Sequence, residues 1–169
     1  MRNLILATSA ALVVAGAASA DVVVNLGNNY LAGGASVTAG SGAVTGSLTG
    51  VSISFDFVSG GGVSWASDLA LVVNGTQLGG IDMLFGPTFA GWWSFHGPDS
   101  AANGHYADTQ ALDGWAASYG LLLGNDFGPA AGCQYNNVVV TLHGVEAVPA
   151  PGAIALLGRA GFAARRRRA

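Results

Sequence analysis

The sequence predicts an all-β protein, and three observations lead to this fold class. Apolar and polar residues alternate with a period of two in several short runs, most clearly from Val51 to Phe57, which is the pattern of a strand with one buried face. Turns rich in Gly, Pro and Asn separate the runs, and helical periodicity is nearly absent. About eight short strands in one domain indicate an antiparallel β-sandwich, with a jelly roll as the expected arrangement.

The strands are expected, in chain order, at residues 22–26, 51–57, 69–73, 76–78, 81–85, 91–95, 116–123 and 138–143. Asn74 and Gly75 lie between two of them, and Asn-Gly favours a two-residue type I′ hairpin turn. Residues 33–50 are rich in glycine and suit either a loop or a weak edge strand. A helix over residues 108–117 is an alternative that Gly114 disfavours.

The N-terminal segment has the pattern of a secretory signal peptide. Arg2 precedes a mostly apolar stretch, and Ala18-Ser19-Ala20 matches an A-x-A cleavage site. We therefore expect residues 1–20 to form a cleaved signal helix, which leaves Asp21 as the first residue of the mature chain.

The C-terminal residues 148–169 join a Pro pair, a short apolar stretch and an arginine cluster. The apolar stretch, residues 152–164, would form a short hydrophobic helix of roughly 20 Å. A full membrane span needs about twenty apolar residues, and Arg159 interrupts this one. A basic tail that binds anionic lipid or nucleic acid is the alternative interpretation.

This order of features resembles the bacterial PEP-CTERM sorting signal. The residues that match are Val148, Pro149, Pro151, Leu156, Leu157, Arg165, Arg166, Arg167 and Arg168. Ala150 and Arg159 depart from the family pattern, which has Glu and an apolar residue there. The resemblance implies transient membrane anchoring through the C-terminus and processing by an exosortase-like enzyme after passage through the export machinery.

Between these ends, residues 21–147 are expected to form one domain without a single Lys or Arg. All nine acidic residues of the chain lie in it. Each carboxylate must therefore face water, accept hydrogen bonds, meet a His or bind a cation, because an unpaired buried charge is too costly. Without a basic patch, the domain is not expected to bind nucleic acid.

A second resemblance covers most of residues 50–145. Ser64 to Val73, followed by Asn74-Gly75, resembles an early strand of proprotein-convertase P domains and related jelly rolls. Gly114-Trp115, Leu121 to Asp126, and Asn137 to Leu142 are similar to the closing strands of that fold. The resemblance implies an accessory or binding module.

Two pairs of residues are candidates for ligand binding. Asp68 and Asp126 lie at the ends of predicted strands beside small polar residues, and carboxylate oxygens suit Ca²⁺. Hydrogen bonds from nearby backbone groups or from Ser and Asn side chains are the alternative use of these two carboxylates. Trp92 and Trp93 are adjacent, so strand alternation sends one inward and the other outward. The exposed indole would suit stacking on a sugar, although aromatic residues in small sandwiches more often belong to the core.

Signs of an enzyme are few. Residues 62–66 approach a Gly-x-Ser-x-Gly motif around Ser64 but lie inside a predicted strand, where a nucleophile elbow does not occur. A hydrolase would need Ser64 to meet a His and an Asp. His96, Asp99, His105 and Asp108 fall within thirteen residues and suit zinc as ligand types, but a solvated loop explains them better.

The sequence as a whole predicts an exported, non-enzymatic protein of the cell surface or extracellular matrix. It would reside in the cell envelope or outside the cell and have exopolysaccharide as a partner. A carbohydrate-binding module is the alternative function, and a secreted hydrolase is a second alternative.

Overall fold

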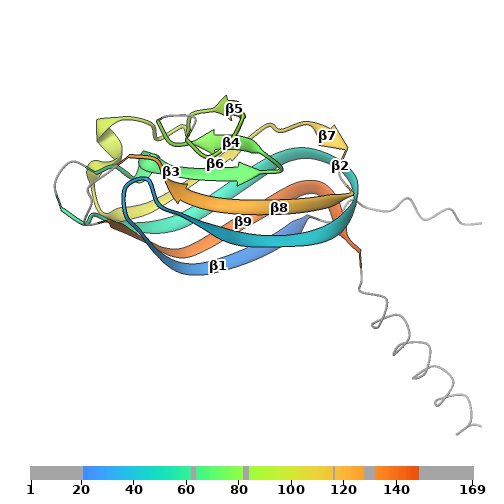
Figure 1. The fold of residues 1–169 in the computed structure, drawn as a ribbon, viewed down its shortest axis with the longest axis horizontal. Coiled ribbons are helices and arrows are strands. Elements are labelled where there is room, and N and C mark those ends of the chain that lie inside the picture. Colours follow the sequence, from blue (N-terminus) through green and yellow to red (C-terminus); the bar gives the residue numbers. More distant parts are fainter. Residues whose placement is uncertain (1–20, 62–63, 82–83, 116, 128–131, 149–169) are drawn as a thin grey trace, which may run out of the picture.

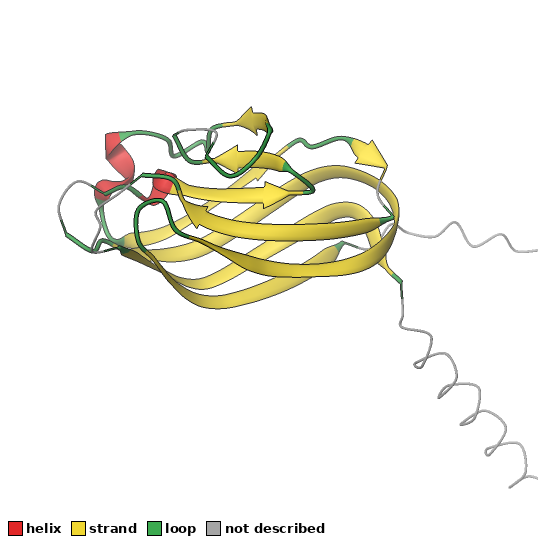
Figure 2. Cartoon of the chain, viewed as in Figure 1, coloured by secondary structure: helices red, strands yellow, loops and turns green. Residues whose placement is uncertain are grey.

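A computed structural model describes residues 21–61, 64–81, 84–115, 117–127 and 132–148, and they form an all-β fold (Figures 1 and 2). The signal and C-terminal helices expected from the sequence lie outside these residues. The elements, in chain order, are β1 (Val22–Leu31), β2 (Ser36–Val58), the 3₁₀ turn η1 (Ala66–Asp68), β3 (Leu69–Val73), β4 (Thr76–Gly79), β5 (Thr88–Gly91), the 3₁₀ turn η2 (Pro98–Ala101), β6 (Gly104–Gln110), β7 (Gly114–Trp115), β8 (Ser118–Asn125) and β9 (Cys133–Ala147).

The long strand β2 belongs to two groups of paired strands. Its first part, residues 36–43, pairs with β8, which continues the order β2-β8-β3-β4-β5. Its second part, residues 44–58, pairs with β9 on one side and with β6 on the other, in the order β1-β9-β2-β6. Figure 1 shows β2 bending at one end of the molecule and continuing in the other group. We call these groups the β8 layer and the β9 layer.

Among the described residues, all strand pairs are antiparallel except β4 and β5, which run parallel. The antiparallel prediction therefore fails only at this point. β4 and β5 are joined by a connection from residue 80 to residue 87, whereas an antiparallel pair can be closed by a tight two-residue turn.

The glycine-rich segment 33–50, expected to be a loop or an edge strand, supplies the start of β2 and pairs with β8 and β9. Its glycines have a physical role where β2 begins to pair with β9. Gly46 has φ of +118°, and a Cβ there would lie 2.6 Å from the backbone oxygen of Gly144. A side chain at this position would push β2 and β9 apart. The glycines that made the strand pattern of this segment weak in the sequence therefore allow the two backbones to approach closely.

The core between the layers confirms the predicted alternation. Val51, Ile53, Phe55 and Phe57 of β2 are buried, and so is the alternate set on β9, Val138, Val140 and Leu142. Leu69, Leu71 and Val73 of β3 face them with Leu121 and Leu123 of β8. These side chains form one cluster, in which apolar burial supplies the main driving force for folding.

The β3–β4 hairpin also agrees with the prediction. Asn74 and Gly75 have φ values of +50° and +86°, as a type I′ turn requires at both central residues. One local expectation is wrong, because strand β5 ends at Gly91, where a strand over 91–95 was expected to begin. The described residues between 108 and 117 belong in part to β6 and β7, which agrees with the argument against a helix there.

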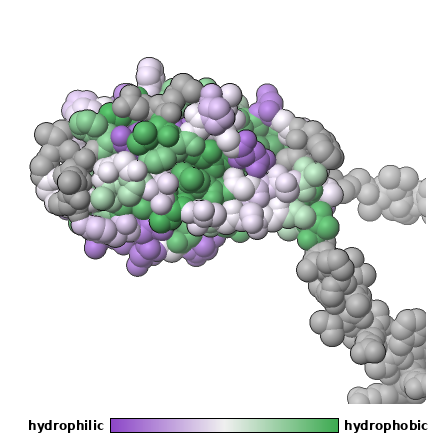
Figure 3. All heavy atoms as spheres, in the orientation of Figure 1, coloured by the Kyte–Doolittle hydropathy of each residue, from purple (hydrophilic) through white to green (hydrophobic). Residues whose placement is uncertain are grey.

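The two layers differ in the side chains on their outer surfaces. In the β8 layer, Ala70 and Val72 are buried, and the Phe85 ring lies so close to Gly124 that a Cβ there would come within 2.4 Å of it. Figure 3 shows apolar residues gathered over the middle of the face on which β3 and β8 lie in Figure 1. The outer side of the β9 layer instead carries Ser, Thr, His and Asp side chains joined by hydrogen bonds. Within the described residues, no helix is long and apolar enough to cross a membrane.

Candidate functional site

The two adjacent tryptophans occupy opposite environments, one buried and one exposed, although both lie beyond the end of β5 and not in a strand. Trp93 is only 2% exposed, and its indole Nε1 donates a hydrogen bond of 2.6 Å to the backbone oxygen of Leu69. Gly79 leaves the space for this ring, since a Cβ there would lie 1.7 Å from the indole nitrogen. Trp93 is thus a core residue, and Trp92, which is 58% exposed, is the one able to contact a ligand.

Trp92 forms the centre of an exposed aromatic cluster. Its ring stacks on the exposed ring of His96, with centroids 5.2 Å apart and planes 19° from parallel, and the edge of Phe89 approaches it at 5.8 Å. Gln110 fixes the backbone below it, because its side-chain amide donates to the carbonyl oxygen of Trp92 at 2.9 Å. The indole therefore has ring contacts on the protein side and remains open to solvent over more than half of its surface.

Asp68 and Asp126, predicted as possible Ca²⁺ ligands, lie side by side in the fold. The backbone N–H of Asp126 donates to the backbone oxygen of Asp68 at 3.1 Å, next to the paired residues Leu69 and Asn125 of β3 and β8. Asp68 is fully buried and Asp126 is 7% exposed. The fold thus brings together two acidic residues that lie far apart in the sequence.

Each of the two carboxylates accepts hydrogen bonds from the protein. Asp68 Oδ2 accepts the backbone N–H of Trp65 at 2.8 Å. Asp126 Oδ2 accepts the backbone N–H of Ile81 at 2.8 Å and the side-chain amide of Gln77 at 3.1 Å. Gly80 permits this approach, because a Cβ there would lie 2.0 Å from Asp126 Oδ2. The hydrogen-bonding alternative of the sequence analysis therefore describes part of what both residues do.

Burial sets the protonation of Asp68. The loss of hydration raises the pKa of its carboxyl to about 6, the negative charge of Asp126 acts in the same direction, and the hydrogen bond from Trp65 opposes them. The second oxygen, Asp68 Oδ1, is buried without a hydrogen-bond partner among the described residues. This oxygen is available to a proton or to a cation.

Among the residues that the structure describes, no group of three or more His, Cys, Asp and Glu side chains is placed to hold a metal ion. The expected solvated loop around His105 is wrong, since this residue and Asp108 belong to strand β6. His105 pairs with Asp56 at 2.8 Å, and His96 stacks on Trp92. Asp108 Oδ2 accepts the backbone N–H of Ser94 at 2.7 Å.

Ser64, the serine considered for a hydrolase, bonds to Ser59 at 2.7 Å. Another serine, which the sequence analysis missed, meets a histidine and an aspartate. Ser52 Oγ lies 2.6 Å from His143 Nε2, and His143 Nδ1 lies 2.8 Å from Asp21 Oδ2. Alternation indicates that Ser52 and His143 point away from the core, but only the pairing of β2 with β9 shows that they face the same way side by side.

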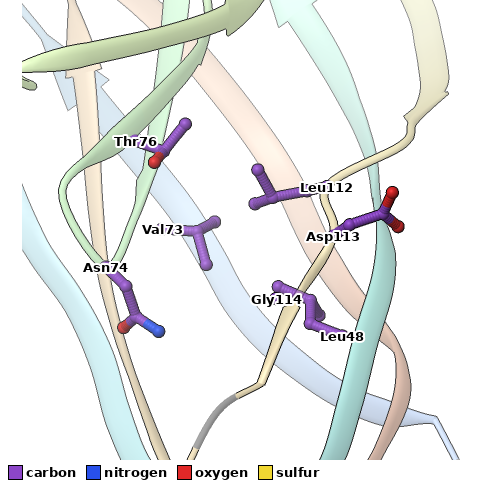
Figure 4. Close-up of a pocket in the computed structure, with 7 residues that line it drawn as sticks. All are labelled: Leu48, Val73, Asn74, Thr76, Leu112, Asp113 and Gly114. Carbon is purple, nitrogen blue, oxygen red and sulfur yellow. The ribbon is translucent and has the colours of Figure 1, made fainter.

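A small cleft lies beside the β3–β4 turn. It has a volume of about 160 Å³ and is lined by Leu48, Val73, Asn74, Thr76, Leu112, Asp113 and Gly114 (Figure 4). Two of its polar side chains already make hydrogen bonds within the protein. The Asn74 side chain bonds to Ser118 and Gly120, and the Thr76 hydroxyl bonds to Thr88. In Figure 4 the Asp113 carboxylate points away from the opening. The cleft therefore offers apolar contact with little polar recognition.

The residues of the two processing signals lie mostly outside the described part of the chain. This holds for Ala18 and Ala20 of the signal cleavage site, and for Pro149, Pro151, Arg165, Arg166, Arg167 and Arg168 of the C-terminal signal. Val148 is described, and its backbone N–H donates to the backbone oxygen of Ala43 at 3.0 Å. Comparisons of the chain with protein-family models, with curated proteins and with solved structures found no match.

The raised pKa of Asp68 predicts a specific dependence of stability on pH. Because the folded pKa of about 6 exceeds the unfolded value of 3.8, the folded state binds more protons between these pH values. The Asp68 contribution to stability is then fully present below pH 4 and is lost as the pH rises to about 6. The loss is about 3 kcal/mol, at about 1.4 kcal/mol for each pKa unit.

The side chain of Asp68→Asn stays neutral at all pH values. We therefore expect this variant to become more stable, relative to the unmodified chain, when the pH is raised from 4 to 7. Urea unfolding at both pH values measures this difference, and Asp99→Asn at an exposed position serves as the control. An equal effect of Asp68→Asn at the two pH values would show that Asp68 does not titrate in this range.

Proposed function

We propose that this chain is an exported surface protein. The main role of its folded domain is to bind a ligand and not to catalyse a reaction. The positions of the first and last strands support the two processing signals predicted from the sequence. Strand β1 begins at Val22, one residue after the expected signal cleavage, and β9 ends at Ala147, directly before the C-terminal signal. Removal of either end would leave the described strands whole.

The PEP-CTERM-like ending gives the proposal its localisation. The chain passes through the export machinery, is held transiently in the membrane by its C-terminus, and meets an exosortase-like processing enzyme. It then belongs to the cell envelope, the cell surface or the extracellular matrix. The described termini of the domain leave at the same end of the molecule (Figure 1), so a C-terminal attachment would leave the opposite end clear of the membrane.

The strand orders support the more specific prediction of a jelly roll, the arrangement that P-domain-like modules share. A jelly roll has eight strands in two sheets, and its first strand pairs with its last. Here β1 pairs with β9, the two parts of β2 pair with β8 and with β6, and β3 pairs with β4. Jelly rolls commonly serve as lectin domains, which favours a binding module over a purely structural one.

The observation that carries a carbohydrate-binding function is the exposed ring of Trp92, which packs against His96 and Phe89. A sugar ring presents an apolar face of C–H bonds, and a large rigid aromatic side chain contacts it at low entropic cost. His96 beside Trp92 adds a polar ring that can exchange hydrogen bonds with hydroxyl groups. The domain has no Lys or Arg, so neutral polysaccharide suits it better than a strongly anionic one.

A bound Ca²⁺ ion is a second proposal, carried by Asp68 and Asp126. Two neighbouring carboxylates that are almost fully buried need a compensating charge, and the domain has no Lys or Arg to provide it. Protons supply this charge below the pKa of Asp68, and a hard divalent cation would supply it at neutral pH. Asp68 Oδ1 would be one ligand, with neutral oxygens completing the shell.

The two processing signals predict the mass of the mature protein. A species that begins at Asp21 and lacks Arg165 to Arg168 is expected in the native host, since cleavage would occur at Ala20 and near Pro149. Intact-mass spectrometry of protein from the envelope and medium measures this. A full-length product confined to the cytoplasm would refute export.

Loss of the exposed indole should weaken polysaccharide binding. We expect Trp92→Ala to reduce retention on immobilised neutral polysaccharide by about tenfold or more, which corresponds to about 1.4 kcal/mol. Affinity electrophoresis on a panel of glucans and galactans measures the retention. Tyr30→Ala removes another exposed ring, on β1, and should leave retention unchanged. Equal retention of the Trp92→Ala and unmodified proteins on every polysaccharide that binds would exclude Trp92 as the platform.

Calcium should raise the thermal stability at pH 7, because a ligand that binds only the folded state stabilises it by mass action. We expect millimolar Ca²⁺ to raise the unfolding temperature and EDTA to reverse the rise. Asp68→Asn should respond less than the unmodified chain, whereas Asp99→Asn should respond equally. A rise of the same size in Asp68→Asn would place any bound calcium elsewhere.

A further inference from the structure

Four side chains on the outer face of the β9 layer form a continuous chain of hydrogen bonds. Thr109 Oγ1 lies 2.7 Å from Ser52 Oγ, which lies 2.6 Å from His143 Nε2, and His143 Nδ1 lies 2.8 Å from Asp21 Oδ2. Thr109 is on β6, Ser52 on β2 and His143 on β9, and Asp21 directly precedes β1. Adjacent strands in the order β1-β9-β2-β6 thus supply one group each.

The chemistry of these groups fixes where the protons lie. Hydrogen bonds from His143 and from the backbone N–H of Gly144 lower the pKa of Asp21, so its carboxylate is ionised at neutral pH and can only accept. His143 Nδ1 must then carry a hydrogen, and in the uncharged form of the ring Nε2 is an acceptor. In that form Ser52 O–H donates to Nε2, and the Thr109 hydroxyl donates to Ser52 Oγ.

We propose that Ser52 is a nucleophile activated by His143 and that it accepts acyl groups from carboxylic esters. A serine whose proton can pass to an imidazole, itself oriented by a carboxylate, is recognised by this geometry and not by its order in the sequence. Ser52 Oγ is the attacking atom and His143 Nε2 is the general base. Asp21 and Thr109 are positioning residues.

The reaction balances without a cofactor. Ser52 Oγ forms a bond to the ester carbonyl carbon while its proton moves to His143 Nε2. The bond from that carbon to the alkoxy oxygen then breaks, and the departing alcohol takes the proton from His143. Water, deprotonated by the same nitrogen, releases the acid and restores Ser52. The Thr109 hydroxyl, no longer needed by Ser52 after attack, can turn its hydrogen toward the oxyanion.

The surroundings of the four hydrogen-bonded side chains indicate the shape of the substrate. The side chains of His143 and Asp21 are 30% and 43% exposed, and Ser52 is half-buried on a sheet surface. Gly50 lies beside the imidazole, where a Cβ would come within 3.7 Å of His143 Cδ2. An ester on an extended molecule can lie across such an open surface. The proposal goes beyond carbohydrate binding, because it uses neither Trp92 nor His96.

The direct test is covalent labelling of the full-length chain with diisopropyl fluorophosphate. Ser52 Oγ would bond to phosphorus, fluoride would leave, and the serine proton would pass through His143 to solvent. Peptides from a pepsin digest locate the adduct, since residues 21–147 contain no Lys or Arg for trypsin. We expect the adduct on Ser52 in the unmodified protein and no adduct there in Ser52→Ala.

Matched variants separate activation from simple exposure. Ser54 lies two residues further along the same side of β2, and within the described residues no hydrogen bond joins it to a histidine. Ser54→Ala should label like the unmodified chain, whereas His143→Gln should label at least about a hundredfold more slowly. Asp21→Asn can still accept the hydrogen bond from Gly144, but its amide donates to Nδ1 and favours the wrong tautomer, so it should also label slowly.

Circular dichroism melting curves verify that each variant is folded. If His143→Gln does not fold, the labelling rates of Asp21→Asn and Ser54→Ala decide whether Ser52 is activated. A second measurement is the release of nitrophenol from p-nitrophenyl acetate by the unmodified chain, which the fluorophosphate should block. Labelling that is absent, that falls on another serine, or that is as fast in Asp21→Asn would overturn the proposal. Trp92→Ala should label normally, so failure of carbohydrate binding leaves this test intact.

Discussion

Backbone hydrogen bonding along β2 is the interaction on which the rest of the structure depends. This strand pairs with β8 through its first part and with β9 and β6 through its second, so both layers are assembled on one segment. The close approach of the second part of β2 to β9 needs a residue without a side chain at Gly46, where a Cβ would meet the backbone of Gly144. The position of β2 between β9 and β6 also places Ser52 between His143 and Thr109.

The lack of Lys and Arg in the domain imposes a second constraint, on the carboxylates. Asp21 and Asp56 on the surface pair with histidines and have lowered pKa values, whereas Asp68 is buried with a raised pKa. The first kind loses stabilisation as the pH falls, and the second loses it as the pH rises. The pH dependence of this protein is therefore a balance of opposing contributions, to which a bound cation would add a third.

Strand β6 connects the surfaces proposed to contact ligands. Gln110, its last residue, holds the backbone of Trp92, and the preceding residue, Thr109, bonds to Ser52. The acidic pair Asp68 and Asp126 instead lies where β3 begins and β8 ends. Gln110 pairs with the buried residue Val51 and Thr109 with the outward Ser52, so the two side chains point to opposite faces of β6. A cation at the acidic pair would stabilise the β8 layer.

The sequence by itself determined the all-β class, the buried side of each main strand, the Asn74-Gly75 turn and the absence of basic partners, because these follow from composition and local periodicity. It also implied opposite directions for Trp92 and Trp93 without indicating which one is exposed. Only the tertiary structure decided that residue 36 onward forms a central strand and that Ser52 meets His143. The reason is physical: a contact between distant strands depends on their order and register, and a shift of one residue would turn Ser52 to the other face.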